Sequence, residues 1–148
     1  MEILIQNKKA KMNYEILEKY NAGMELFGFE VKSLRQKIGS LDGTHITVRG
    51  GEVFLIGAQI PPYQLKNTPK NYDSRRNRRL LLTKKEIKEL SDIESKRGLT
   101  IVPTIVYNSG KNIKIEIASV RGKKKYDKRE DIKKRDTNRD IQRTLKGE

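Results

Sequence analysis

Alternating apolar and polar positions predict β-strands over much of the chain. In residues 13–20, Tyr14, Ile16 and Tyr20 share one phase, and the residues between them are mostly polar. This alternation is typical of a strand with one buried face. Gly23 is expected to mark a turn or a bulge, after which the alternation resumes.

Two β-hairpins are predicted further along the chain. Residues 44–49 and 52–56 flank Gly50-Gly51, a dipeptide favoured in tight hairpin turns. A second hairpin turns at residues 108–110, and residues 80–82 form a short apolar strand between the two hairpins. We expect one face of the second hairpin's first strand to hold Leu99, Ile101, Ile105 and Tyr107, and one face of its second strand to hold Ile113, Ile115 and Ile117.

Helical periodicity interrupts the strands twice. In the first helix, Val31, Leu34 and Ile38 recur at spacings of three and four residues. Glu30 favours the start of this helix and Gly39 its end.

The second helix is predicted to begin at Thr83, because Thr83 and Glu86 have the spacing of a capping box. In this motif the hydroxyl and the carboxylate each satisfy a free backbone N–H group. Gly98 is expected to close the helix. Its buried stripe consists of Ile87, Leu90 and Ile93.

About six short strands with two or three short helices predict a mainly β domain over residues 1–120. A small closed or partly open antiparallel barrel would hide most of the strand edges. Residues 121–148 form a basic C-terminal tail with too few apolar groups to fold alone. Helix-favouring pairs such as Glu130 with Lys134 indicate that this tail, disordered alone, becomes helical against a partner.

The charge of the chain favours a polyanionic partner. Thirty-three Lys and Arg against 19 Asp and Glu give a net charge of +14 over 148 residues. The excess is concentrated in residues 66–79 and in the tail. Nucleic acid fits this charge better than an anionic membrane, because no amphipathic helix with aromatic anchors is evident. The absence of a signal peptide, a membrane-length apolar run and cysteine predicts a cytoplasmic protein.

Catalytic and metal-binding chemistry finds little support. The single histidine, His45, lies on the polar phase of a strand, and cysteine is absent, so no His or Cys metal site is expected. Glu30, Asp42 and Glu52 are available for a magnesium site, but their spacing does not force them together. No phosphate-binding P-loop is present. We therefore expect no catalytic residue, no metal and no cofactor.

Basic and aromatic residues suited to RNA remain. The loop arginines can bind phosphates or stack on unpaired bases. Tyr63, Tyr72 and Tyr126 provide stacking faces, with ordinary packing as the alternative for each. Lys32 and Arg35 form either a further contact or a solvated helix face. The four loop arginines are Arg75, Arg76, Arg78 and Arg79.

Six segments, in order, resemble the SsrA-binding protein (small protein B) family. They are Asn7-Lys8-Lys9-Ala10, Glu30-Val31-Lys32-Ser33-Leu34-Arg35, Gly51-Glu52-Val53-Phe54-Leu55, Arg79-Leu80-Leu81-Leu82, Gly98-Leu99-Thr100-Ile101-Val102-Pro103 and Arg121-Gly122-Lys123-Lys124-Lys125-Tyr126-Asp127-Lys128-Arg129-Glu130. The resemblance covers nearly the whole chain, and the tail segment is its most specific part.

The resemblance implies an OB-like closed antiparallel barrel that grips the tRNA-like domain of transfer-messenger RNA. It also implies delivery of that RNA to a stalled ribosome, where the tail folds as a helix in the empty decoding site and messenger channel. The implied partners are transfer-messenger RNA, the ribosome with its small-subunit RNA, and elongation factor Tu through the charged transfer-messenger RNA. No membrane partner is implied.

The resemblance implies site residues at the positions of this chain that match the family's segments. The segments that resemble the transfer-messenger RNA surface, together with the neighbouring loop arginines, give as RNA-binding residues Asn7, Lys8, Lys32, Arg35, Arg75, Arg76, Arg78, Arg79 and Leu81. The tail residues that resemble the decoding-site segment are Gly122, Lys123, Lys124, Tyr126, Asp127, Lys128 and Arg129. The chain departs from the family pattern at Asn21, where an acidic residue is common, and at Asn77, where a proline is common.

Three other interpretations are open from the residues alone. A ribosomal or tRNA-binding OB module would explain the charge and the strands but not the tail motif. A small magnesium-dependent nuclease would require converging carboxylates and would cleave RNA. A chromatin-type structural protein would bind duplex DNA as strongly as folded RNA.

Overall fold

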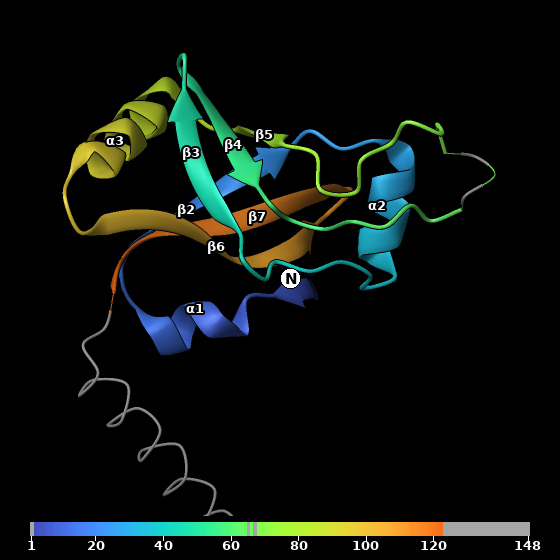
Figure 1. Ribbon diagram of the computed structural model, residues 1–148, viewed down its shortest axis with the longest axis horizontal. Helices are drawn as coiled ribbons and strands as arrows, with labels where there is room; N and C mark the ends of the chain where they lie inside the picture. The colour runs from blue at the N-terminus through green and yellow to red at the C-terminus, as the bar shows by residue number, and fades with distance from the viewer. Residues whose placement is uncertain (1, 65, 67, 123–148) are drawn as a thin grey trace, which may run out of the picture.

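The computed structural model describes residues 2–64, 66 and 68–122 (Figure 1). Its β-strands are β1 (Glu2–Gln6), β2 (Tyr14–Met24), β3 (His45–Arg49), β4 (Glu52–Ile56), β5 (Arg78–Leu81), β6 (Leu99–Ser109) and β7 (Asn112–Gly122). Its helices are α1 (Lys8–Asn13), α2 (Gly28–Arg35) and α3 (Lys84–Ser95). The predictions of a disordered tail and of its helical state concern residues 123–148, which lie outside the described residues.

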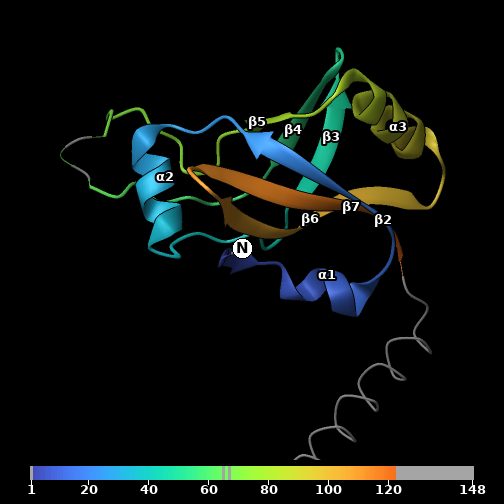
Figure 2. The same cartoon turned by 180° about the vertical axis from the view of Figure 1, so that it is seen from behind.

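The strands form one antiparallel sheet in the order β1-β6-β7-β2-β5-β4-β3. The β3–β4 ribbon crosses over β6 and β7, so the sheet is strongly curled (Figures 1 and 2). Within the described residues no strand pairing joins β1 to β3, and the sheet stays open at these two ends. The mainly β class is thus confirmed, whereas the predicted closure of the barrel is not.

The main hydrophobic core fills the inside of the curled sheet. Leu55 and Val53 of β4 meet Ile115 and Ile117 of β7 in this cluster, together with Leu90 of α3. A second, smaller cluster under α1 joins Ala10, Val102, Ala118 and Val120 on the other face of β6 and β7. Both faces of these long strands are therefore covered, which explains their nearly continuous burial.

The first predicted hairpin and the capping box of α3 are confirmed. Gly50 and Gly51 have φ angles of 57° and 75°, the left-handed pair that a two-residue hairpin turn requires. The Thr83 hydroxyl accepts the Glu86 N–H at 3.2 Å, and the Glu86 carboxylate accepts the Thr83 N–H at 3.1 Å. The helix ends at Ser95, before Gly98.

Two β-bulges, one in β2 and one in β6, shift the predicted alternation of buried and exposed residues. β2 continues through Gly23, which pairs with both Leu81 and Lys114, so the predicted turn or bulge there is wrong. The irregularity falls instead between Ile16 and Glu18. A second bulge between Pro103 and Ile105 in β6 moves Ile105 to the face opposite Ile101, and Val106 enters the main core instead.

The first helix ends earlier than its periodicity predicted. The Ile38 N–H donates to the Ser33 carbonyl at 3.0 Å and the Lys37 N–H donates to the Leu34 carbonyl at 2.8 Å. With Lys37 at a φ of 61°, this is a Schellman motif. Ile38 therefore lies outside α2. The strand β1 and the helix α1 were not predicted, and β7 runs to Gly122, two residues past the predicted domain boundary.

Candidate nucleic-acid interface

A buried carboxylate organises the surface formed by α2, the loop after β4 and the strand β5. Glu30, in the first turn of α2, has no exposed surface. One of its oxygens accepts the Phe27 N–H at 2.8 Å, which satisfies a free donor at the helix start. The same side chain faces the loop, where it meets Tyr72, Arg76 and Arg78.

Arg78 is the innermost partner of Glu30. Its side chain is fully buried because Arg78 and Leu80 share the inward phase of β5. Its Nε donates to Glu30 Oε2 at 2.8 Å, and its other nitrogens donate to the carbonyls of Ala58 and Ser74 at 2.8 and 3.0 Å. With every side of the guanidinium occupied, Arg78 holds the loop against β4 and α2.

Tyr72 and Arg76 complete the cluster. The Tyr72 hydroxyl lies 2.8 Å from Glu30 Oε2 and accepts from Arg78 at 3.0 Å. Arg76 Nη2 lies 2.6 Å from Glu30 Oε1, and this side chain is 25% exposed. Arg76 thus links the buried carboxylate to the surface of the protein.

These contacts set the protonation of the cluster. Burial alone would raise the pKa of Glu30, but hydrogen bonds from Arg76, the Phe27 amide and Tyr72, together with the charge of Arg78, lower it below its usual value. Burial and the neighbouring Glu30 raise the pKa of Tyr72 to about 12. At neutral pH Glu30 is ionised and Tyr72 is protonated.

An exposed aromatic surface lies directly above the cluster. Phe27 is 50% exposed, and the Arg76 guanidinium sits 4.2 Å from its ring centroid. Phe29 stacks on Phe27 at 5.5 Å and meets Tyr72 edge-on at 4.7 Å. An aromatic face with a stacked arginine is suited to unpaired bases, which bind by stacking and cation–π contacts.

Further cations and apolar side chains border this surface. Lys32 Nζ lies 6.0 Å from the ring centroid of Tyr63, which is 44% exposed. Arg35 Nη2 donates to the Lys111 carbonyl at 2.9 Å, tying α2 to the start of β7. Between α2, β5 and the β6–β7 turn lies a groove of about 350 Å³, lined in part by Leu26, Val31, Leu81, Lys111 and Lys114.

The comparisons with known proteins decide the family. The family model for SmpB protein matches residues 4–147. The chain is 50% identical over 148 residues to the SsrA-binding protein of Thermosipho melanesiensis, covering 99% of this chain and 100% of the relative. It is 45% identical over 147 residues to the SsrA-binding protein of Microcystis aeruginosa, covering 99% of this chain and 95% of the relative.

The chain belongs to the SmpB protein family. A solved structure described as "tmRNA-SmpB: a journey to the center of the bacterial ribosome" is similar as well. It is 39% identical in sequence, has a TM-score of 0.69, and the match covers 82% of this chain and 85% of that chain. The expected resemblance to this family is confirmed. The relatives are named for binding SsrA and not for a catalytic activity.

Several residues carried over from the SmpB family meet at the α2–loop–β5 surface. Arg79 and Leu81 point outward from β5, and Leu81 is 47% exposed. Arg79 pairs with Glu25 at 3.4 Å and lies 3.8 Å from Glu52. The residues at this surface are the half-buried Arg76 and the exposed Lys32, Arg35, Arg75, Arg79 and Leu81.

Arg78, Asn7 and Lys8 are placed differently from the rest. The Arg78 side chain exposes no surface, and its guanidinium is bonded inside the protein. Asn7 is 9% exposed and donates its side-chain N–H to the Pro103 carbonyl at 2.9 Å. Lys8 is exposed at the start of α1, which packs on β2 and β6 away from α2 (Figures 1 and 2). Of the tail residues only Gly122, exposed at the end of β7, lies within the described residues.

Two features of the surface were not foreseen from the sequence. The first is Phe27, whose exposed ring stacks under Arg76. The second is the burial of Arg78, which its position two residues before the core residue Leu80 could have revealed.

Asn21, one of the two positions that depart from the family pattern, is hydrogen-bonded within the protein. Its side-chain oxygen accepts from the Tyr107 hydroxyl at 2.8 Å. Within the described residues no group of three or more His, Cys, Asp or Glu is arranged to hold a metal, and no helix is long and apolar enough to cross a membrane.

Proposed function

We propose that the protein binds the tRNA-like domain of transfer-messenger (SsrA) RNA and delivers it to stalled ribosomes for trans-translation. The observation that carries this proposal is the near full-length identity to SsrA-binding proteins, at up to 50%. The likeness to the tmRNA-SmpB structure supports the ribosomal half of it. The exposed aromatic and basic surface over Glu30 gives the binding a physical basis.

The α2–loop–β5 surface is the RNA-binding face in this proposal. Arg76 and Phe27 stack on an unpaired base, while Lys32, Arg35, Arg75 and Arg79 neutralise phosphates. Leu81 provides an apolar contact in the neighbouring groove. Arg78 and Asn7 act as positioning residues, because their polar groups are already bonded inside the protein. Lys8 contributes from the α1 side of the curled, OB-like sheet.

The basic tail performs the second half of the proposed function. Residues 123–148, which follow the end of β7 at Gly122, enter the empty decoding site and messenger channel as a helix, in place of codon–anticodon pairing. The residues proposed to act there are Gly122, Lys123, Lys124, Tyr126, Asp127, Lys128 and Arg129. The protein acts in the cytoplasm, meets elongation factor Tu only through the charged transfer-messenger RNA, and performs no catalytic step.

A competition experiment tests the proposed RNA. The labelled tRNA-like domain of transfer-messenger RNA is bound to the protein at physiological salt and displaced by bulk tRNA or by duplex DNA. A clear preference for the transfer-messenger fragment is expected, because shape and unpaired bases are read in addition to charge. Equal displacement by all three would contradict the proposal and favour a generic nucleic-acid-binding module.

A truncation tests the division of labour between the folded part and the tail. Deleting residues 123–148 is expected to leave affinity for the tRNA-like domain largely intact and to abolish rescue of ribosomes stalled without a codon. Loss of both activities together would show that the tail is part of the RNA-binding surface.

A further inference from the structure

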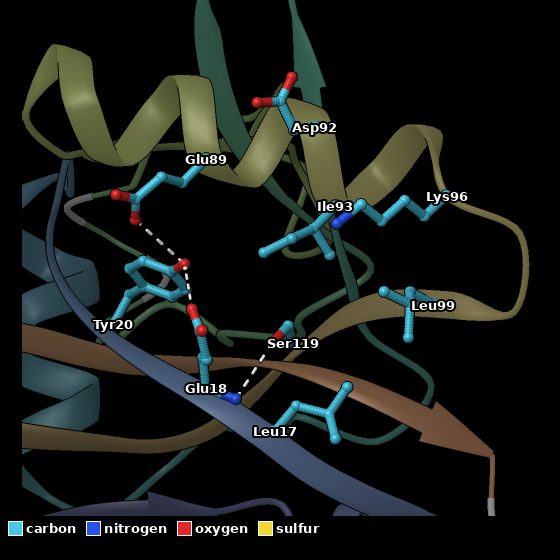
Figure 3. Close-up of a pocket in the computed structure, with 9 residues that line it drawn as sticks. All are labelled: Leu17, Glu18, Tyr20, Glu89, Asp92, Ile93, Lys96, Leu99 and Ser119. Atoms are coloured by element: carbon cyan, nitrogen blue, oxygen red, sulfur yellow. Dashed lines mark hydrogen bonds between the residues drawn. The ribbon is translucent and has the colours of Figure 1, made fainter.

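A cleft of about 430 Å³ lies between α3 and the strands β2, β6 and β7 (Figure 3). The helix α2 of the proposed RNA-binding face lies at the opposite end of the molecule from α3 (Figures 1 and 2). Its apolar side chains are Leu17, Ile93 and Leu99. Leu17 is 42% exposed, whereas the other apolar residues of β2 are buried or half-buried.

The bulge in β2 explains why this cleft exists. Ile16 pairs with Val120 and Glu18 with Ser119, so Leu17 is the extra residue of the bulge. The Glu18 N–H donates to the Ser119 hydroxyl at 3.1 Å. The bulge thereby turns the Glu18 side chain toward α3 and leaves Leu17 exposed at the edge of the cleft (Figure 3).

Two carboxylates in the cleft share one hydroxyl and form no ion pair within the part of the chain that the structure describes. The Tyr20 hydroxyl lies 3.0 Å from a Glu18 oxygen and 3.2 Å from a Glu89 oxygen. A hydroxyl has a single proton to donate, so it cannot satisfy both. Among the described residues no Lys or Arg forms an ion pair with either carboxylate. Burial and these two carboxylates raise the pKa of Tyr20, which keeps the hydroxyl protonated.

The chemistry of the cleft suits a basic side chain. Asp92 adds a third carboxylate to the lining, although it points away from Tyr20 in Figure 3, and Lys96 is the one cation among the described residues of the lining. The described residues offer no arrangement that would hold a metal. An apolar wall beside uncompensated carboxylates, on a chain of net charge +14, attracts Lys or Arg flanking an apolar residue.

We propose that this cleft binds the basic C-terminal segment of the same chain, residues 123–148. Eleven of these 26 residues are Lys or Arg and six are Asp or Glu. Ile132 is followed directly by Lys133, Lys134 and Arg135. This sequence combines an apolar side chain for the apolar wall of the cleft with basic side chains for its carboxylates.

The position of the segment makes the contact intramolecular. Lys123 follows Gly122 at the end of β7, and Ser119 of the same strand lines the cleft. An extended chain spans roughly 3.3–3.6 Å per residue, so Ile132 reaches back to the cleft easily. A tethered segment also has an effective concentration on the order of millimolar when its tether is short, which favours it over a free basic peptide.

This contact goes beyond the proposed function and requires no RNA. The Lys and Arg groups that bind the cleft are the same groups that would meet an anionic partner of the tail. Docking on the acidic cleft therefore competes with every such partner, and it screens the tail from nonspecific polyanions until a stronger site displaces it.

Paramagnetic broadening in the full-length protein tests the proposal. The chain has no cysteine, so Thr137→Cys provides a unique position for a nitroxide label in the tail. We expect the amide signals of Glu18, Leu99 and Ser119 to lose at least about twofold more intensity than those of α2, at the opposite end of the molecule from α3, as a tethered contact requires. Adding salt to about 1 M, where the Debye length is roughly 3 Å, should remove most of this difference.

Charge variants separate the cleft from a general attraction. Glu18→Gln with Glu89→Gln should abolish the selective broadening, whereas the matched pair Glu25→Gln with Glu52→Gln should preserve it. Replacing Lys133, Lys134 and Arg135 by Gln in the tail should also abolish it and leaves the folded part unaltered. Equal broadening over the whole surface would overturn the proposal. So would broadening in a mixture of labelled and isotope-enriched chains, because that would be a contact between copies.

Discussion

The charge of the Glu30 carboxylate is compensated inside the protein, whereas the charges of the Glu18 and Glu89 carboxylates are not compensated by any ion pair among the described residues. Glu30 is fully buried and is bound by two arginines, a tyrosine hydroxyl and a backbone amide. Glu18 and Glu89 lie at the edge of a cleft, share the Tyr20 hydroxyl and have no ion-pair partner among the described residues.

The difference indicates what each group does for the protein. A buried charge is tolerated only when its partners are inside with it, so the Glu30 cluster is a structural support for the α2–loop–β5 surface. Carboxylates that lie at least partly in water and have no ion-pair partner cost little and can still bind a cation. The first group therefore controls stability and the shape of the proposed RNA-binding face, whereas the second is available for binding.

The largest expected effect is the loss of Glu30. Glu30→Ala leaves Arg78 buried without its counter-charge, which is expected to cost about 3–5 kcal/mol of unfolding free energy. Glu18→Ala, the matched change in the cleft, should cost under about 1 kcal/mol. Chemical denaturation of both variants measures the difference, and equal losses would refute the contrast between the two groups.

The pH dependence of stability should follow Glu30. Because the folded protein lowers the pKa of Glu30, its contribution is fully present above the unfolded value of 4.5 and is lost as pH falls through the lower folded value. Glu30→Gln should therefore lose less stability than the unaltered protein as pH falls below 4.5. Unfolding curves recorded at several acidic pH values test this, and parallel pH profiles would show that other carboxylates dominate.

The Tyr72 hydroxyl, which bridges Glu30 and Arg78, offers a finer test of this cluster. Tyr72→Phe removes a hydroxyl between Glu30 and Arg78, and a lost bond to a buried charge is expected to cost about 1.5–3 kcal/mol. The measurement is the midpoint and slope of urea unfolding. No destabilisation would mean that water replaces the hydroxyl in the cluster.

The exposed ring of Phe27 should matter for RNA and not for folding. Phe27→Ala is expected to weaken binding of the tRNA-like domain by about 1–3 kcal/mol, the usual loss of one base–aromatic stack. Leu17→Ala, which shortens the exposed side chain of the cleft, should leave this affinity unchanged. Titration of both variants with the same RNA distinguishes them.

The smallest expected effect is that of Tyr20→Phe. Because its hydroxyl joins two carboxylates in the lining of the cleft, water in the cleft can replace it, and the change in stability should stay within about 1 kcal/mol. Thermal unfolding beside Tyr72→Phe provides the comparison. A loss as large as that of Tyr72→Phe would place the cleft carboxylates in the same structural class as Glu30.

Local patterns in the sequence predicted the elements that depend on neighbouring residues. The Gly50-Gly51 hairpin and the Thr83–Glu86 capping box form because turn geometry and helix capping are decided within a few residues. Periodicity likewise placed Leu34 and Leu90 in the core.

Features that depend on distant residues could not be predicted in the same way. The bulge before Glu18 is fixed by Ser119, about a hundred positions away in sequence, and it decides which side chains enter the cleft. Arg78 has the charge of an RNA ligand, but the strand places it inside, opposite Glu30. The sequence motif thus located the candidate surface, whereas tertiary packing decided which of its arginines remain exposed.

Photo-crosslinking of the tRNA-like domain of transfer-messenger RNA to the full-length protein would show which face of the folded part lies against the RNA. Thiouridine-substituted RNA is irradiated in the complex, and the attached peptides are identified by mass spectrometry. We expect crosslinks in the folded part at Phe27, Tyr63 and neighbouring residues of α2 and β5. Crosslinks in the folded part confined to α3 or to the β3–β4 hairpin would contradict it and move the RNA to another face.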